Sequence, residues 1–485
     1  MKTRSVLLIC YYFPPIGGGG VPRALKMAKY LGDFGWDVHV LTVDPVYHAT
    51  LDPTLLAQLP ADVRIHRARE LQIIPRRGAS PETTASAKKK TGNRPAGDSQ
   101  SASAQAPKGQ PSAAEVQAAP RSSLTSQIKQ QVVGLLKKVK PYLLIPDDQI
   151  LWMPQALKLG REIMRREKID VIFSTSGPVT NHLIAKRLAG EFGCKWVADF
   201  RDPWTQNMHT SGIAWRERLE ERMEESVMAQ ADAITTVTAT FAENFRAKHG
   251  SRVRRMELIY NGFDQEDFIG LTPEHAAPGK FHAVYAGILY QKRNPRLLLQ
   301  AIQELIEEGK VEREDLLLSF AGVFDYPGYS ENRDCVEALG LGDIVRVLGN
   351  LPHKEALGLM KGADALLLIG DVSPDAGAYI PGKLYEYMGI GKPILALNKA
   401  GEATGIIETF RLGQVADPED KDAIKQAYYR LYREWKEQGQ TGSAERDATF
   451  SERVKPYERR EQARQLAELM EELLSSAERA GDPTI

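Results

Sequence analysis

The sequence predicts an α/β protein built from two doubly wound parallel sheets in tandem, and three observations lead to this expectation. Short β-branched runs alternate with segments of helical periodicity, the pattern of parallel strands covered by helices on both faces. The pattern restarts after a stretch rich in Pro, Gly and Ala at 271–279. The length of 485 residues is roughly three times the ~150 residues of an average domain.

The first half of the chain should contribute one sheet and the second half another. Strands are expected in the first half at 6–11, 38–43, 171–174, 196–200, 233–237 and 257–260. Strands are expected in the second half at 281–286, 316–321, 345–348, 365–369 and 393–397. The last expected helix, at 457–474, has no strand after it and is free to pack back on either domain.

One stretch differs from the rest in composition. Between Gly78 and Ser123 the only large apolar residue is Val116, so this part cannot bury enough surface to offset its ordering entropy. We expect a disordered insertion there. The expected domain bounds are 1–75 and 128–270 for the N-terminal domain, 76–127 for the insertion, 271–450 for the C-terminal domain and 451–485 for the returning helix.

A basic amphipathic helix is expected at 124–140. Its apolar positions recur at helical spacing, and Lys129, Lys137, Lys138 and Lys140 lie among them. Such a helix can lie on an anionic membrane surface, or it can pack on its own domain. Both interpretations remain open from the residues alone.

Charge and cysteine content exclude several classes of protein. Lys and Arg number 63, and Asp and Glu also number 63, which argues against a protein built to attract nucleic acid over long range. Cys10, Cys194 and Cys335 are far apart in sequence and form neither a metal motif nor a disulfide framework, which predicts a reducing cytoplasm.

No segment approaches the ~18 apolar residues of a spanning helix. The first apolar run ends at Pro14 and Pro15 without a cleavage site, so we expect a strand there rather than a signal peptide.

The first candidate site is the glycine loop Gly17, Gly18, Gly19 and Gly20, between a strand and a helix. Glycines let backbone amides approach an anion, and the helix start adds a favourable dipole. The loop is not a dinucleotide fingerprint, because Pro22 stands where a glycine is required, and it is not a P-loop. A tight turn is the alternative. Arg23 could bind the same anion.

A second cluster, Asp199-Phe200-Arg201-Asp202-Pro203-Trp204, follows another strand, where open α/β sheets bind ligands. A guanidinium flanked by Asp199 and Asp202 can orient sugar hydroxyls and neutralise developing charge, although a structural ion-pair turn would look the same. Ser176 also follows a strand, and His182 comes after it in the next helix. Either side chain could line the same cleft, and packing is the alternative for His182.

Two candidate clusters lie in the second half. Gly287 ends the first strand there, and Lys292 and Arg293 follow, so a cation pair could hold a diphosphate leaving group without a metal. The stretch 371–397 places small residues at a helix start, and Glu386 one turn later could accept both hydroxyls of a ribose. The candidate residues of that stretch are Asp375, Gly377, Ala378, Tyr379, Lys383, Leu384 and Glu386.

Together these segments resemble family 4 of the glycosyltransferases, which has the GT-B fold. The matching motifs are Tyr-Phe-Pro-Pro-x-Gly-Gly at 12–18, Asp-Phe-Arg-Asp-Pro-Trp at 199–204, Tyr-Asn-Gly-Phe-Asp at 260–264 and Pro-Gly-Lys-Leu-Tyr-Glu-Tyr at 381–387. The resemblance covers nearly the whole chain outside about 76–127. It implies two Rossmann-like domains facing across a cleft, with a C-terminal helix that crosses back to the first domain.

The resemblance further implies a retaining, metal-independent enzyme without a cofactor. Such an enzyme moves a sugar from a nucleotide sugar to a saccharide or lipid-linked saccharide, often at the inner face of the membrane. Glu386 matches the ribose-binding Glu, Gly17–Gly20 match the loop near the diphosphate, and Lys292 or Arg293 matches its basic partner. Arg201 falls where many members have a His that contacts the donor sugar, so Arg201, Asp202 and Asp199 are the expected catalytic residues. Arg23, Ser176 and His182 are expected on the acceptor side.

The sequence departs from the family pattern at two positions. Ala378 stands where many members have a Glu, and Ile288 stands where the usual Arg follows the strand's glycine. Two rival hypotheses therefore remain beside transfer: a nucleotide-sugar isomerase with the same fold, and a non-catalytic homologue that acts as a binding subunit.

Overall fold

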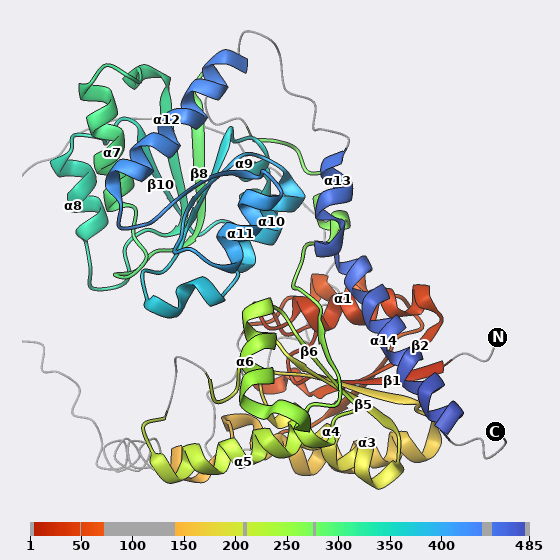
Figure 1. The fold of residues 1–485 in the computed structure, drawn as a ribbon. Coiled ribbons are helices and arrows are strands. Elements are labelled where there is room, and N and C mark those ends of the chain that lie inside the picture. The colour runs from red at the N-terminus through yellow and green to blue at the C-terminus, as the bar shows by residue number, and fades with distance from the viewer. Residues whose placement is uncertain are drawn as a thin grey trace, which may run out of the picture.

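The computed structural model describes residues 4–48, 50–71, 141–206, 211–274, 278–438 and 449–480. The insertion expected at 76–127 and the basic helix expected at 124–140 lie outside the described residues. Within the described ranges the chain forms two α/β domains, stacked one above the other in Figure 1.

The N-terminal domain is built on a seven-stranded sheet with the order β3-β2-β1-β4-β5-β6-β7, and all of its neighbouring strands pair in parallel. The strands are β1 (Arg4–Ile9), β2 (Trp36–Val43), β3 (Arg64–Ala68), β4 (Val171–Thr175), β5 (Lys195–Phe200), β6 (Ala233–Thr236) and β7 (Met256–Leu258). The helices are α1 (Pro22–Tyr30), α3 (Met153–Arg166), α4 (Thr180–Phe192), α5 (Ala214–Gln230) and α6 (Ala239–His249).

The C-terminal domain is built on a six-stranded parallel sheet with the order β10-β9-β8-β11-β12-β13. The strands are β8 (Phe281–Ile288), β9 (Leu316–Val323), β10 (Val345–Gly349), β11 (Ala365–Ile369), β12 (Ile394–Leu397) and β13 (Gly413–Ala416). The helices are α7 (Arg296–Glu307), α8 (Glu331–Ala338), α9 (His353–Lys361), α10 (Gly382–Ile390), α11 (Glu402–Thr409) and α12 (Lys421–Gln438). The predicted fold class is confirmed.

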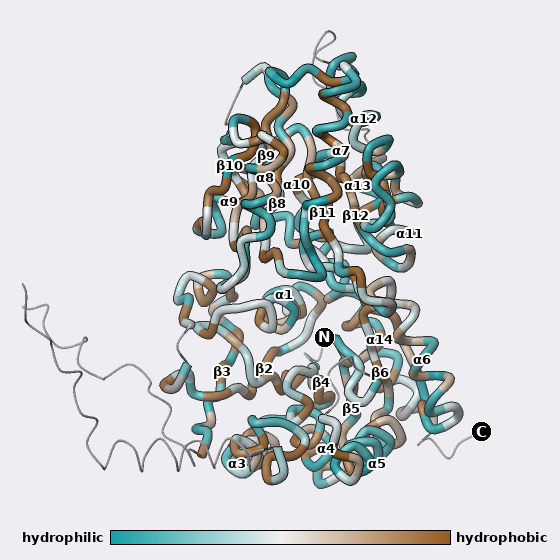
Figure 2. The backbone as a smooth tube through the Cα atoms, turned by 90° about the vertical axis from the view of Figure 1, so that its left-hand side faces the viewer, coloured by the Kyte–Doolittle hydropathy of each residue, from teal (hydrophilic) through white to brown (hydrophobic). Residues whose placement is uncertain are grey.

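The period of two along each strand explains why helices cover both faces. In β1, Leu7 and Ile9 belong to one core cluster and Val6 and Leu8 to another, on opposite faces of the sheet. All four side chains are at most 1% exposed. Figure 2 shows the hydrophobic strands inside each domain and more hydrophilic helices around them.

The last helix, α14 (Arg459–Ala480), returns to the N-terminal domain after α13 (Thr449–Val454) and runs beside α1 (Figure 1). Ala463, Leu466 and Met470 are fully buried in the core cluster that also contains the inner side of α1. These apolar side chains of α14 help to cover one face of the N-terminal sheet. The predicted return of the last helix to the N-terminal domain is therefore confirmed.

The two segments that cross between the domains are bonded to each other. The Phe263 amide donates to the Tyr457 carbonyl at 3.0 Å, and the Arg459 amide donates to the Phe263 carbonyl at 2.8 Å. Gly262 permits this approach, since a Cβ at that position would lie 1.9 Å from the Tyr457 carbonyl oxygen. The outgoing and returning chains therefore form one hydrogen-bonded connection.

The same connection is fastened to α1 by charge. Asp264 accepts from Lys26 at 2.6 Å, from Lys29 at 2.9 Å and from the Tyr30 hydroxyl at 2.7 Å. Burial alone would raise the pKa of Asp264, but these donors lower it to about 2. The Asp264 carboxylate therefore stays ionised, and its bonds to α1 hold the crossing segment against the first helix of the N-terminal domain.

Among the described residues, no helix combines the length and the apolar character that crossing a bilayer requires.

Candidate active site

The predicted loops follow the carboxyl ends of neighbouring strands in each sheet. In the N-terminal sheet the strand order reverses between β1 and β4, and in the C-terminal sheet it reverses between β8 and β11. Crevices outside such switch points are where open α/β sheets bind ligands. The glycine loop and Ser176 leave the first switch point, while Lys292 and Asp371 belong to the loops that leave the second.

The glycine loop has the conformation that its composition predicts. Gly18 has a φ of +109°, a value that favours glycine, and both Gly18 and Gly19 are exposed. A Cβ at either position would meet no atom within 4 Å, so there is room for another molecule above this backbone. The Gly17 amide donates to the Thr50 carbonyl at 3.1 Å, which holds the start of the loop.

Arg201 ties the glycine loop to the loop after β4. Its Nη1 donates to the Gly20 carbonyl at 2.9 Å and its Nε donates to the Ser176 carbonyl at 2.5 Å. The Arg201 amide in turn donates to the Ser176 hydroxyl at 3.1 Å. Arg201 therefore positions both loops, and Ser176, expected at the acceptor, is 2% exposed and engaged in this contact.

Asp199 and Arg23 do not face the cleft as expected. Asp199 is fully buried and accepts from Arg23 through both oxygens, at 2.7 and 2.9 Å, and from Thr175 and Thr235 at 2.7 Å each. Burial raises the pKa of Asp199, but the charge of Arg23 and the hydrogen bonds from Arg23, Thr175 and Thr235 together outweigh it and lower the pKa. We therefore correct the expected roles: this pair is structural, with Asp199 not catalytic and Arg23 not at the acceptor.

His182 also turns inward. Its Nδ1 lies 2.8 Å from the Ser174 hydroxyl, and its ring packs on Phe200 at 4.5 Å between centroids. Complete burial lowers the pKa of His182 to about 3, so the ring is neutral. The expected acceptor contact of His182 is corrected to a packing role.

In the C-terminal domain, the loop after β8 docks on the loop after β11. Lys292 donates to the Ser373 hydroxyl at 3.3 Å, and the Tyr290 hydroxyl donates to Asp371 at 2.8 Å. Arg293 lies over the Tyr290 ring at 5.2 Å. The cation pair is thus held against the segment that continues into α10.

That segment then approaches the N-terminal domain. Tyr379 meets Phe241 of α6 edge to face at 5.1 Å, and Ala378 packs with it against the N-terminal core. Burial raises the pKa of Tyr379, and the charges of Asp202 and Asp375 raise it further. Asp202 from one domain and Asp375 from the other are both exposed, and both lie near enough to act on this one ring.

Glu386 lies on α10 between Lys383 and His353. Lys383 donates to its Oε2 at 2.7 Å, and His353 Nε2 lies 3.5 Å from its Oε1. Burial raises the pKa of Glu386, but His353 and Lys383 outweigh it and keep the pKa below its ordinary value. The hydrogen bond to Glu386 correspondingly raises the pKa of His353. The sequence analysis missed His353, although its place at a helix start directly after β10 was the available signal.

A second contact between the domains was also missed. Glu402, at the start of α11, accepts from the Thr240 amide at 2.6 Å and from its hydroxyl at 2.8 Å. Thr240 lies in the first turn of α6, so the carboxylate satisfies a free amide at the positive end of that helix. No local sequence signal joins residues 162 positions apart.

Comparisons with known proteins bear on the family and the fold of the chain. A family model described as "Glycosyl transferase 4-like domain" matches residues 107–262, and one described as "Glycosyl transferases group 1" matches residues 272–448. No match to the sequences of curated proteins is found.

Several solved structures share the fold at low sequence identity. Sucrose-phosphate synthase from Thermosynechococcus elongatus is 14% identical, with 98% of this chain and 100% of that chain covered and a TM-score of 0.56. A glycosyltransferase from Rickettsia africae ESF-5 is 13% identical, with coverage of 98% and 99% and a TM-score of 0.56. Anabaena Alr3699/HepE in complex with UDP and glucose is 14% identical, with coverage of 97% and 100% and a TM-score of 0.53.

The buried pair predicts a large stability effect. Asp199→Asn leaves the Arg23 guanidinium buried without its counter-charge and should lower the free energy of unfolding by about 3–5 kcal/mol. Since the pKa of Asp199 lies below its ordinary 3.8, the loss should persist across neutral pH and shrink only in acid, where wild type also loses this charge. Chemical denaturation of both proteins measures the difference.

Glu191→Gln is the matched control, because Glu191 pairs with Arg161 while both side chains are about one-third exposed. It should cost less than ~1 kcal/mol. Equal losses in the two variants would contradict the structural role of the Asp199–Arg23 pair.

Proposed function

The chain belongs to the family-4 type of glycosyltransferases, whose two domain models together match more than half of it, and we propose that it moves a sugar from a nucleoside diphosphate to an acceptor hydroxyl. We further propose retention of the anomeric configuration and no requirement for a metal ion. The observation that carries the proposal is the contact of the loop after β11 with α6, where Tyr379 meets Phe241 and the charges of Asp202 and Asp375 both act on the Tyr379 hydroxyl.

The leaving group is the first requirement of such a reaction. When the bond from the anomeric carbon to the phosphate oxygen breaks, negative charge develops on the departing diphosphate. Lys292, Arg293 and the amides at the start of α10 would stabilise that charge from one domain, and Gly18 and Gly19 would do so from the other. Interactions that strengthen as charge develops lower the barrier, whereas uniform binding of the donor does not.

The nucleoside would lie further along the C-terminal domain. Glu386 is held ionised and would accept both ribose hydroxyls, while His353 and Lys383 keep its two oxygens in place. Anabaena Alr3699/HepE, similar in fold, has been solved with UDP and with UDP-glucose. We therefore propose a uridine nucleotide as the first donor to test.

On the acceptor side the burial of Asp199 leaves Asp202 as the exposed carboxylate of its motif. Asp202 would orient the attacking hydroxyl, and Arg201 would act through the loops that it joins. A saccharide or a lipid-linked saccharide fits this role, and synthesis of a polysaccharide or glycoconjugate is the corresponding process.

The isomerase hypothesis is weakened by the same burial. An isomerase needs an acid–base pair beside the sugar. His182 and Asp199 are enclosed, so Asp202 and Asp375 are the remaining groups of that set. The binding-subunit hypothesis is still motivated by Ala378 and by Ile288, whose side chain is 52% exposed at the end of β8.

A product assay separates the three functions. The enzyme is incubated with UDP-sugars alone and with added saccharide acceptors, and the products are analysed by mass spectrometry. Transfer predicts a glycosylated acceptor and free UDP only when acceptor is present. A new nucleotide sugar without acceptor would identify an isomerase, and no product together with tight binding would identify a binding subunit.

The ribose assignment makes a separate prediction. Glu386→Ala should weaken UDP binding at least about tenfold, which corresponds to roughly 1.4 kcal/mol, because two hydroxyls lose their acceptor. Calorimetry with wild type and variant measures the change. Glu408→Ala, an exposed carboxylate on α11, should leave the affinity unchanged, and an unaltered affinity in Glu386→Ala would remove the assignment.

We also propose a cytoplasmic enzyme that binds the inner face of the membrane through 124–140. Tyr142 and Leu143, directly after this segment, are 50% and 71% exposed, and Tyr142 stacks on exposed Trp215 at 6.4 Å. Aromatic side chains favour the membrane interface, and anionic lipid attracts each nearby lysine by about 1 kcal/mol.

Replacement of Lys129, Lys137, Lys138 and Lys140 by Gln should therefore weaken binding to vesicles containing phosphatidylserine by at least roughly a hundredfold. Co-sedimentation measures this, and vesicles of phosphatidylcholine alone provide the control. Equal binding of wild type and variant to anionic vesicles would remove the role of this segment.

A further inference from the structure

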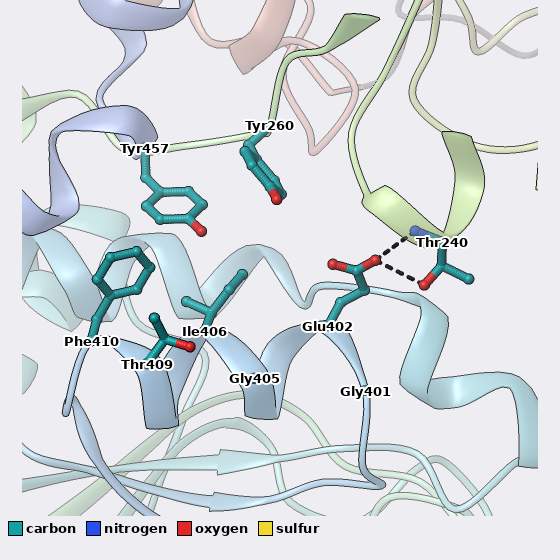
Figure 3. A pocket seen from close by; sticks show the side chains of 9 residues that line it. All are labelled: Thr240, Tyr260, Gly401, Glu402, Gly405, Ile406, Thr409, Phe410 and Tyr457. Atoms are coloured by element: carbon teal, nitrogen blue, oxygen red, sulfur yellow. Dashed lines mark hydrogen bonds between the residues drawn. The ribbon is translucent and has the colours of Figure 1, made fainter. Parts of the chain in front are cut away.

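A cavity of about 460 Å³ lies between the domains beside the crossing segments. We call it the hinge pocket; Tyr260 of the outgoing segment, Tyr457 of the returning segment, and Glu402, Ile406, Thr409 and Phe410 of and after α11 are among its walls (Figure 3). Its volume is within the ~300–1,000 Å³ of small-molecule sites.

The hinge pocket contains an anionic oxygen. One carboxylate oxygen of Glu402, Oε1, accepts hydrogen bonds from the amide and the hydroxyl of Thr240. The other oxygen points away from Thr240 into the pocket (Figure 3). Among the residues that line the pocket there is no Lys, Arg or His. The nearby Arg453 donates to the Phe410 carbonyl at 3.1 Å, and Arg459 donates to Asn261 and Gln462.

Aromatic rings form the opposite wall. The Tyr260 and Tyr457 rings lie 5.0 Å apart between centroids at 55°, and Phe410 meets Tyr457 edge to face at 5.7 Å. Burial raises the pKa of both tyrosines, and the charge of Glu402 raises it further. Both phenol groups are therefore neutral, and both lie close enough to Glu402 for its charge to act on them.

We propose that the hinge pocket binds a small organic cation, a primary or quaternary ammonium group. Ring faces attract cations by about 0.5–2 kcal/mol each. The residues that line the pocket include no Lys, Arg or His, so an ammonium group would supply the counter-charge that the Glu402 carboxylate lacks there. The rival occupant is a neutral saccharide, which would use the same rings and carboxylate oxygen but would leave the charge uncompensated.

Both domains line the pocket, so a bound cation would hold Tyr260, Glu402 and Tyr457 in their present arrangement. Ligand binding to this arrangement would stabilise it by mass action. The inference goes beyond sugar transfer and does not depend on it, because the site and its test involve no nucleotide.

Isothermal titration of the full-length protein with tetramethylammonium chloride tests the proposal, with sodium chloride at equal concentration as the salt control and sucrose as the neutral competitor. We expect one site per chain and no displacement by sucrose. Glu402→Gln keeps an oxygen for Thr240 but loses the charge, and should weaken binding at least about tenfold. Glu408→Gln, on the same helix and exposed, should not change it.

Two further variants keep the test decisive if Glu402→Gln fails to fold. Tyr260→Phe retains the ring and should bind as wild type does, whereas Tyr260→Leu should lose most of the affinity. The proposal is overturned if tetramethylammonium gives no more heat than sodium at millimolar concentration, if Glu402→Gln binds as tightly as Glu408→Gln, or if sucrose displaces the cation.

Discussion

The buried pair of Arg23 and Asp199 is the contact on which the geometry between the domains depends. Arg23 starts from the helix that follows the glycine loop, reaches Asp199 at the end of β5, and donates to the carbonyls of Ile259 and Tyr260 in the crossing segment. Threonines on the two neighbouring strands complete the shell of Asp199. The exits of β4, β5 and β6, helix α1 and the chain leaving the domain therefore share one polar centre, and none can shift without opening it.

Positive charge accumulates around that centre. Arg201 satisfies carbonyl oxygens rather than a carboxylate. Burial and the nearby charge of Arg23 lower the pKa of Arg459 to about 9. The guanidinium groups of Arg23, Arg201 and Arg459 thus share this region with the carboxylates of Asp199 and Asp202. The hinge pocket, in contrast, is lined by Glu402 and by no Lys, Arg or His.

The sequence was sufficient for the fold class and for the loops because both follow from local patterns. Inner strands are continuous apolar runs, and the motifs occupy the strand exits that such a pattern defines. The edge strands β3 and β13 were missed because Arg-Ile-His-Arg-Ala and Gly-Gln-Val-Ala carry little apolar signal. The roles of Arg23, Asp199 and His182 were misjudged for a different reason: whether a charged group faces a cleft or a core is decided by what packs over it, which no spacing along the chain records.

The contact of Glu402 with Thr240 links the arrangement of the domains to the candidate donor loop. Gly401, directly before Glu402, approaches the loop at Gly377 so closely that a Cβ on Gly401 would lie 2.2 Å from the Gly377 carbonyl oxygen. Tyr379, two residues after Gly377, contacts Phe241, and Phe241 follows Thr240 on α6. Both contacts on α6 thus come from one closely packed unit of the C-terminal domain. Because packed units move as a whole rather than deform, separation of the domains at α6 would carry residues 375–379 away from Asp202. The start of α6 therefore helps to determine whether the two halves of the candidate active site meet.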